Sequence, residues 1–95
     1  NPNERSGFSV FYFQPHSEEF GRVTHESLKR NMKTNDDGLY YGNLAVCRIT
    51  QMPAILVVTA YLIRPDEEEL LLSRDFQCKA ADALIDAVSN FVRNR

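Results

Sequence analysis

The stretch "AILVVTAYLI", residues 54–63, decides the expected fold because it is apolar on both of its faces. A strand that is covered on both sides of a sheet shows such a continuous hydrophobic run, whereas a half-exposed strand alternates. Pro53 marks a break immediately before it. We therefore expect residues 54–63 to form the central strand of a sheet, and the other elements are placed around it.

Three more strands are expected on the N-terminal side of this run. "GFSVFYF" (7–13) is rich in β-branched and aromatic residues, which favour strands. "LYY" (39–41) is a short strand, and Gly42-Asn43 is typical of a tight reversal into "LAVCRIT" (44–50). Together with residues 54–63 these segments supply four strands of the predicted sheet.

A helix is predicted between the first two strands. Ser17 is a suitable N-cap, and Glu18 and Glu19 follow in the first turn, where acidic side chains favour helices. Apolar residues recur with a helical period up to about Lys33. "TNDDG" (34–38) then predicts a turn that ends the helix.

The segment after the central run admits two interpretations. Pro followed by Asp in "RPDE" (64–67) suits a type I turn and a hairpin into a strand at 68–73. Asp66 with Glu69 three residues later is also a helix-opening signature. An unbroken helix over 66–93 would place leucines on its polar side, so we favour the strand.

Residues 76–92 predict a strongly amphipathic C-terminal helix, capped by Ser73 or Asp75. Its apolar arc is wider than one stripe, which is what a helix needs to cover a sheet and also to touch a partner. The residues that widen the arc are the predicted protein-binding surface: Ala81, Ile85 and Val92.

The predicted fold class is therefore α+β, in the order β-α-β-β-β-β-α, with two helices packed on one face of an antiparallel sheet. Residues 1–6 are expected to be a flexible lead-in, and residues 7–95 a single domain excised from a longer protein.

The order helix, three strands, helix and the segment "KAADALIDAV" (79–88) resemble double-stranded RNA-binding domains in topology. That family contacts phosphates through a lysine cluster at the start of its second helix and through a Gly-Pro-x-His-like loop. Here Lys79 is followed by Asp82 and Asp86, and the loop motif is absent. The resemblance therefore implies a relative that binds protein through this helix.

Composition and charge narrow the class of protein. The net charge is −2 and 43% of residues are hydrophobic, which is typical of a globular domain and argues weakly against one built around a nucleic-acid backbone. Cys47 and Cys78 are interpreted as reduced structural thiols, which predicts an intracellular, cytoplasmic or nuclear protein. No apolar run approaches the roughly 18 residues of a membrane helix, so no membrane partner is expected.

No residue pattern indicates catalysis. His16 and His25 are isolated, the two cysteines lack C-x-x-C spacing, and the acidic runs at 35–37 and 66–69 lack the spacing of a calcium loop. We therefore expect a non-enzymatic protein without metal or cofactor.

The predicted function is protein–protein interaction or dimerisation within a larger intracellular protein. The partner would be another protein, other domains of the same parent chain, or a second copy in a homodimer. A dimerising regulatory or chaperone-like subunit is a further possibility. The alternative is binding of double-stranded RNA or other structured nucleic acid through the basic face of the first helix, which is otherwise an ordinary solvated face. That face consists of Arg22, His25, Lys29, Arg30 and Lys33.

Overall fold

The computed structural model describes residues 6–60 and 65–94. The strands are β1 (Phe8–Tyr12), β2 (Asp36–Tyr41) and β3 (Leu56–Val58), and the α-helices are α1 (Glu18–Asn31), α2 (Pro65–Leu71) and α3 (Arg74–Arg93). Two short 3-10 helices are η2 (Pro15–Ser17) and η3 (Ala45–Cys47). The predictions of a strand within 7–13, a first helix beginning at Glu18 and a long C-terminal helix are confirmed.

The sheet is mixed, so the predicted antiparallel sheet is wrong. Its strand order is β2-β1-β3, in which β1 pairs with β2 in parallel and with β3 antiparallel. The reason is that α1 returns the chain along the sheet, so that β2 starts at the same end as β1 and completes a βαβ unit. The topology of a double-stranded RNA-binding domain is excluded by the same parallel pair.

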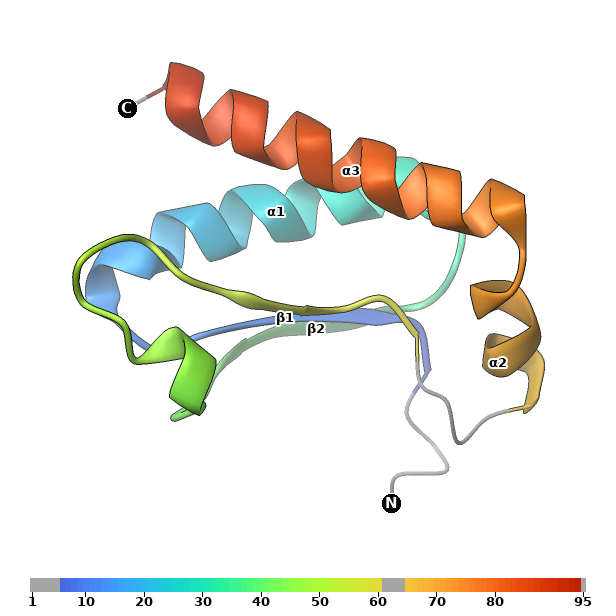
Figure 1. The fold of residues 1–95 in the computed structure, drawn as a ribbon, viewed down its shortest axis with the longest axis horizontal. Helices are drawn as coiled ribbons and strands as arrows, with labels where there is room; N and C mark the ends of the chain where they lie inside the picture. Colours follow the sequence, from blue (N-terminus) through green and yellow to red (C-terminus); the bar gives the residue numbers. More distant parts are fainter. Residues whose placement is uncertain (1–5, 61–64, 95) are drawn as a thin grey trace.

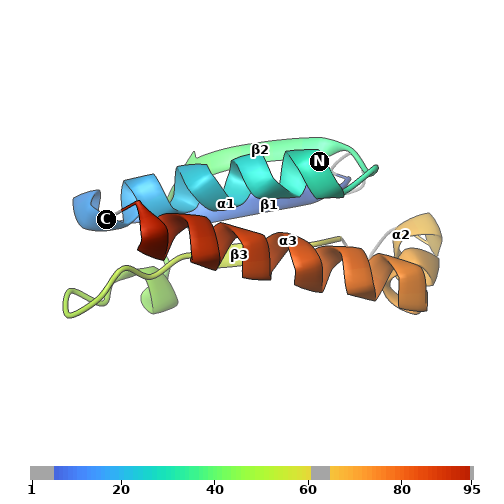
Figure 2. The same ribbon diagram turned by 90° about the horizontal axis from the view of Figure 1, so that it is seen from above.

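The helices form a second layer on one face of this sheet. α1 and α3 run side by side above it, with α3 lying over the β3 edge (Figures 1 and 2). Val10 pairs with Leu39 on one side and with Val57 on the other, and this row faces the helices. The buried core between the two layers consists of Phe8, Val10, Leu28, Met32, Phe76, Ala80 and Ala83.

The start of β1 is fixed against the connection between α1 and β2. The Phe8 amide donates a 3.0 Å hydrogen bond to the Asn35 carbonyl. Gly7 has a φ of +92°, and a Cβ at this position would lie 1.7 Å from the Asn35 oxygen. Only glycine fits this close approach, because it has neither the side chain nor the conformational restriction of other residues.

Two predicted strands differ from the structure. The segment 44–50 is not a strand: η3 and irregular backbone replace it, with Cys47 fully buried and its Sγ donating to the Phe11 carbonyl at 3.5 Å. Among the described residues 54–60, Leu56–Val58 alone forms a strand, and it is the outer neighbour of β1 rather than the central strand. Residues 61–63 lie outside the described residues.

The strand predicted at 68–73 is also wrong, because α2 occupies most of that segment. The periodicity argument assumed one unbroken helix, but the chain breaks at Ser73, whose side chain accepts a hydrogen bond from the Phe76 amide and caps α3. The break lets α2 and α3 orient independently, and Leu70 and Leu71 pack against the core. The helix-opening signature was the correct interpretation.

Candidate functional site

The predicted basic face of α1 is largely neutralised in the structure. Arg22 forms an ion pair with Glu19 one turn earlier. The His25 Nε2 atom lies 2.7 Å from the Asp36 Oδ1 atom at the start of β2. The Phe8 ring packs at 6.0 Å from the imidazole, so this pair fastens α1 to the sheet. The two lysines of the predicted face remain exposed: Lys29 and Lys33.

Arg30, the last member of that face, is directed to α3 instead of to a ligand. Its Nη2 atom donates to Asp86 Oδ2 at 2.8 Å, and Ser27 Oγ lies 3.1 Å from the same oxygen. The hydrogen bond from Arg30, followed by that from Ser27, lowers the pKa of Asp86 below its usual value. These contacts connect the two long helices, so the charge of Arg30 is paired within the fold.

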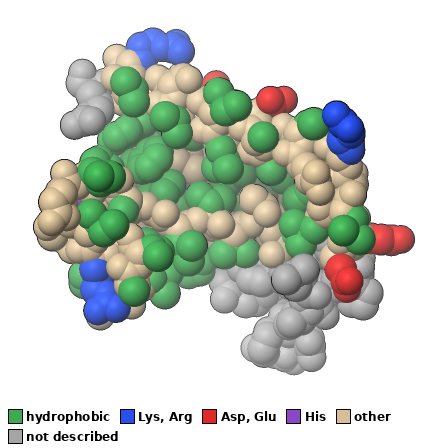
Figure 3. Space-filling view, viewed as in Figure 1, with side chains coloured by type: hydrophobic (Ala, Val, Ile, Leu, Met, Phe, Trp, Pro, Cys, Tyr) green, Lys and Arg blue, Asp and Glu red, His purple; other side chains and the backbone are tan. Residues whose placement is uncertain are grey.

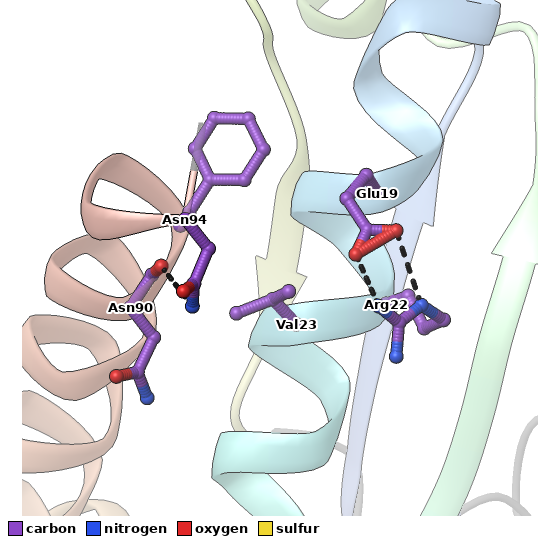
Figure 4. A pocket seen from close by; sticks show the side chains of 6 residues that line it. Glu19, Arg22, Val23, Asn90 and Asn94 are labelled. Atoms are coloured by element: carbon purple, nitrogen blue, oxygen red, sulfur yellow. Dashed lines mark hydrogen bonds and ion pairs between the residues drawn. The ribbon is translucent and has the colours of Figure 1, made fainter.

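A hollow of about 380 Å³ opens between the first turns of α1 and the last turns of α3. Figure 4 shows the Glu19–Arg22 pair and Val23 on the α1 side, and the two asparagines on the α3 side, where Asn94 Nδ2 donates to the Asn90 carbonyl at 2.9 Å. The hollow can accept a small polar group. Its one carboxylate, Glu19, is paired with Arg22. The residues that line the hollow are Glu19, Arg22, Val23, Asn90, Phe91 and Asn94.

The carboxyl ends of β1 and β2 carry a cluster of aromatic side chains. Tyr12 and Tyr41 meet edge to face at 5.6 Å, and Phe13 packs on Tyr41 at the same distance. The Tyr12 hydroxyl donates to Glu18 Oε2 at 3.3 Å. Desolvation, followed by the nearby Glu18 charge, raises the pKa of Tyr12. Ligands of α/β sheets often bind at this end of parallel strands, so the cluster is a second candidate surface.

Neither surface contains a reactive constellation. Within residues 6–60 and 65–94, no three His, Cys, Asp or Glu side chains come together to hold a metal ion. Cys47 is buried, and desolvation raises the pKa of its thiol, which disfavours the nucleophilic thiolate. In the same part of the chain, no helix is long and apolar enough to cross a membrane.

The predicted protein-binding surface on α3 is exposed. Ile85 and Val92 expose 65% and 60% of their surface, and Ala81 is also exposed. The neighbouring Val88 is 48% exposed and belongs to the same side of the helix. The binding role of these residues remains a prediction.

Residues 1–90 match the family model described as N-acetylmuramoyl-L-alanine amidase. The chain belongs to this amidase family. A curated relative is the N-acetylmuramoyl-L-alanine amidase AmiC of Neisseria meningitidis serogroup B, which is 34% identical over 76 residues. That alignment covers 80% of this chain but only 18% of AmiC.

Solved members of the amidase family share the fold. The catalytic domain of CwlV, an N-acetylmuramoyl-L-alanine amidase from Bacillus (Paenibacillus) polymyxa var. colistinus, is 30% identical with a TM-score of 0.90. An N-acetylmuramoyl-L-alanine amidase from Clostridium difficile 630 is 24% identical, also with a TM-score of 0.90. Each superposition covers 98% of this chain and 52% of the solved chain. The chain therefore spans about half the length of these solved relatives.

Membership of the amidase family overturns the functional predictions. A non-enzymatic interaction domain and an RNA-binding domain are both wrong, because the family model and the solved relatives are cell-wall amidases. No compact catalytic motif is recognisable among the described residues, so the sequence does not indicate an enzyme. The one local signal for the correct fold is the strand–helix–strand order of residues 7–41, which permits a parallel pair and an α/β fold.

Proposed function

We propose that this chain is one part of an amidase catalytic domain, and that the complete domain hydrolyses the amide bond between N-acetylmuramoyl and L-alanine. The observation that carries this proposal is the superposition on the CwlV catalytic domain, with a TM-score of 0.90 over 98% of the chain. The match covers the sheet and both long helices, so it extends well beyond a single shared motif.

Such a domain needs reacting groups and a scaffold that holds them, and we assign these two roles to its two parts. Amide hydrolysis needs an activated water, a general base and donors that stabilise the developing oxyanion. The described residues of this chain offer a packed scaffold, with ion pairs that join elements to one another. In the proposal, this scaffold supports reacting groups that lie outside the described residues.

The test is an assay of amide cleavage on a soluble muropeptide that contains the N-acetylmuramoyl-L-alanine bond. The 95-residue chain is produced together with the part of the CwlV catalytic domain that it does not match. Release of peptide with a free L-alanine amino group is expected from the assembled pair and from intact CwlV, which serves as the positive control. An assembled pair that binds the muropeptide without cleaving it would show that the proposed hydrolysis is wrong.

A further inference from the structure

One side of the molecule, formed by the β3 edge and the outer side of α3, is apolar and uncovered. We call it the α3–β3 flank and define it by β3 (Leu56–Val58) and by the residues that line a shallow hollow of about 310 Å³ on α3. Those residues are Leu84, Ile85, Val88 and Ser89. Figure 3 shows hydrophobic side chains across the middle of this side, with the charged side chains at its margins.

The outer backbone edge of β3 is uncovered, like the apolar side chains of α3 above it. Among the described residues β3 pairs only with β1, through Val58, Val57 and Leu56, so its outer edge has no neighbouring strand. No charged side chain occurs in residues 54–60 to protect this edge. Soluble proteins usually block such edges, because they invite pairing with another strand.

The opposite edge of the sheet is protected. β2 begins with Asp36 and Asp37, and Asp36 is held by His25 of α1. Exposed charged side chains, among them Arg22 and Lys29, follow the helix above this edge. Acidic residues at an edge and a polar helix above it discourage a further strand. The two edges therefore differ in the way expected of one outer edge and one internal edge.

The size of the amidase family domain indicates what covers the internal edge. The chain superposes almost completely on 52% of the CwlV catalytic domain, so about half of such a domain lies outside it. A sheet of three strands that ends in a three-residue strand is small compared with the five or six strands of an average sheet. A second half of comparable size needs an interface with both a strand edge and an apolar surface.

We infer that the α3–β3 flank is the surface on which the other half of the amidase domain docks, by pairing a strand with β3 and packing apolar side chains on Ile85 and Val88. This inference rests on the proposal that the chain is one part of a catalytic domain. It assigns the untested surface of α3 to an occupant within that domain. A second copy of this chain could cover the same flank, but it would not supply the missing half.

The experiment co-expresses the tagged 95-residue chain with the unmatched part of the CwlV catalytic domain and measures how much of that part is recovered with the tag. Ile85→Asp combined with Val88→Asp is expected to reduce recovery at least tenfold, because two charges would be buried against apolar side chains. Leu72→Asp is the matched control, since Leu72 is 78% exposed and lies at the end of α2, outside the flank. Circular dichroism checks that each variant chain remains folded.

Hydrogen exchange tests the strand pairing separately. The amides of Leu56–Val58 that face the open edge are expected to exchange more slowly in the assembled pair than in the chain alone. Equal recovery for the double variant and the wild-type chain would overturn the inference. So would a tag that recovers only a second copy of the chain, or nothing at all, under conditions in which the matching half of the CwlV domain, with the same tag, does recover the unmatched part. Muropeptide cleavage is measured on the same samples, so recovery without cleavage contradicts the proposed function and leaves the docking surface supported.

Discussion

At the scale of single residues, the contact of Asp86 with Arg30 and Ser27 is the most informative. Asp86 lies 56 residues after Arg30 and 59 residues after Ser27 in the sequence. Both contacts hold its carboxylate in the charged form. The sequence predicts Arg30 as part of a basic face and Asp86 as a solvent-exposed residue of the last helix. Their pairing could not be predicted, because it depends on how α1 and α3 rotate against each other.

This contact makes stability depend on pH in a defined direction. The pKa of Asp86 is lower in the folded chain than in the unfolded chain, where it is about 4. Its stabilising contribution is therefore complete above that unfolded value and is lost as the pH falls through the folded pKa. We expect Asp86→Asn to destabilise the chain at pH 7, and the difference from wild type to shrink below about pH 4.

Urea unfolding at a series of pH values between neutral and about pH 3 measures this dependence. Asp82→Asn, at an exposed position one turn earlier on α3, is the control for loss of a carboxylate on the same helix. A destabilisation by Asp86→Asn that stays constant down to pH 3 would contradict the assigned role of the charge.

At the scale of elements, α1 and α3 are joined through small residues. Ser27 Oγ donates to the Ala83 carbonyl at 2.6 Å, and both residues are fully buried. Ala80 and Ala87 lie one turn to either side on α3 and are also buried. Small side chains let two helix backbones approach closely, so this contact has no room for a larger residue.

Ala83→Leu is therefore expected to destabilise the chain by about 1–3 kcal/mol, because three added carbon atoms must be accommodated in a packed interface. Ala81→Leu provides the matched control, since Ala81 is exposed on the same helix and should change stability by less than about 0.5 kcal/mol. Urea unfolding gives both values. Equal effects of the two substitutions would show that the helix contact is looser than described.

The same scale shows which elements the sequence could predict. α1 and α3 have long apolar periodicities, and their positions follow from those patterns. The predictions of the short elements were wrong because a local pattern does not distinguish a central strand, apolar on both faces, from an apolar strand at the edge of the sheet. Residues 54–60 are apolar on both faces, yet within this chain they lie at the edge.

At the scale of the whole molecule, this chain should gain stability when the proposed remaining part of an amidase domain binds to it. The buried core is thin, and the exposed large hydrophobic residues include Ile49, Met52, Ile85, Val88 and Val92. A partner that binds only the folded chain stabilises it by RT ln(1 + [L]/Kd), about 2.7 kcal/mol at a hundredfold excess over Kd. We expect the unmatched part of the CwlV domain to raise Tm progressively with its concentration, as measured by calorimetry.

An unrelated protein of similar size and charge is the control for that titration. A Tm that does not change with concentration would contradict docking in solution. The whole-molecule scale is also where prediction from sequence failed most clearly. The solved CwlV catalytic domain is about twice the length of the part that this chain matches, so the residues of this chain indicate an exposed apolar surface but not the chemistry of the family.

The two cysteines differ in burial, so one of them can be labelled selectively for these measurements. Cys47 in η3 is buried and has a raised thiol pKa, whereas Cys78 is exposed in the first turns of α3. A maleimide dye therefore modifies Cys78 selectively in the native chain without any engineered cysteine. Fluorescence from that single position would report on the docking of α3, and subsequent modification of Cys47 would report on opening of the fold.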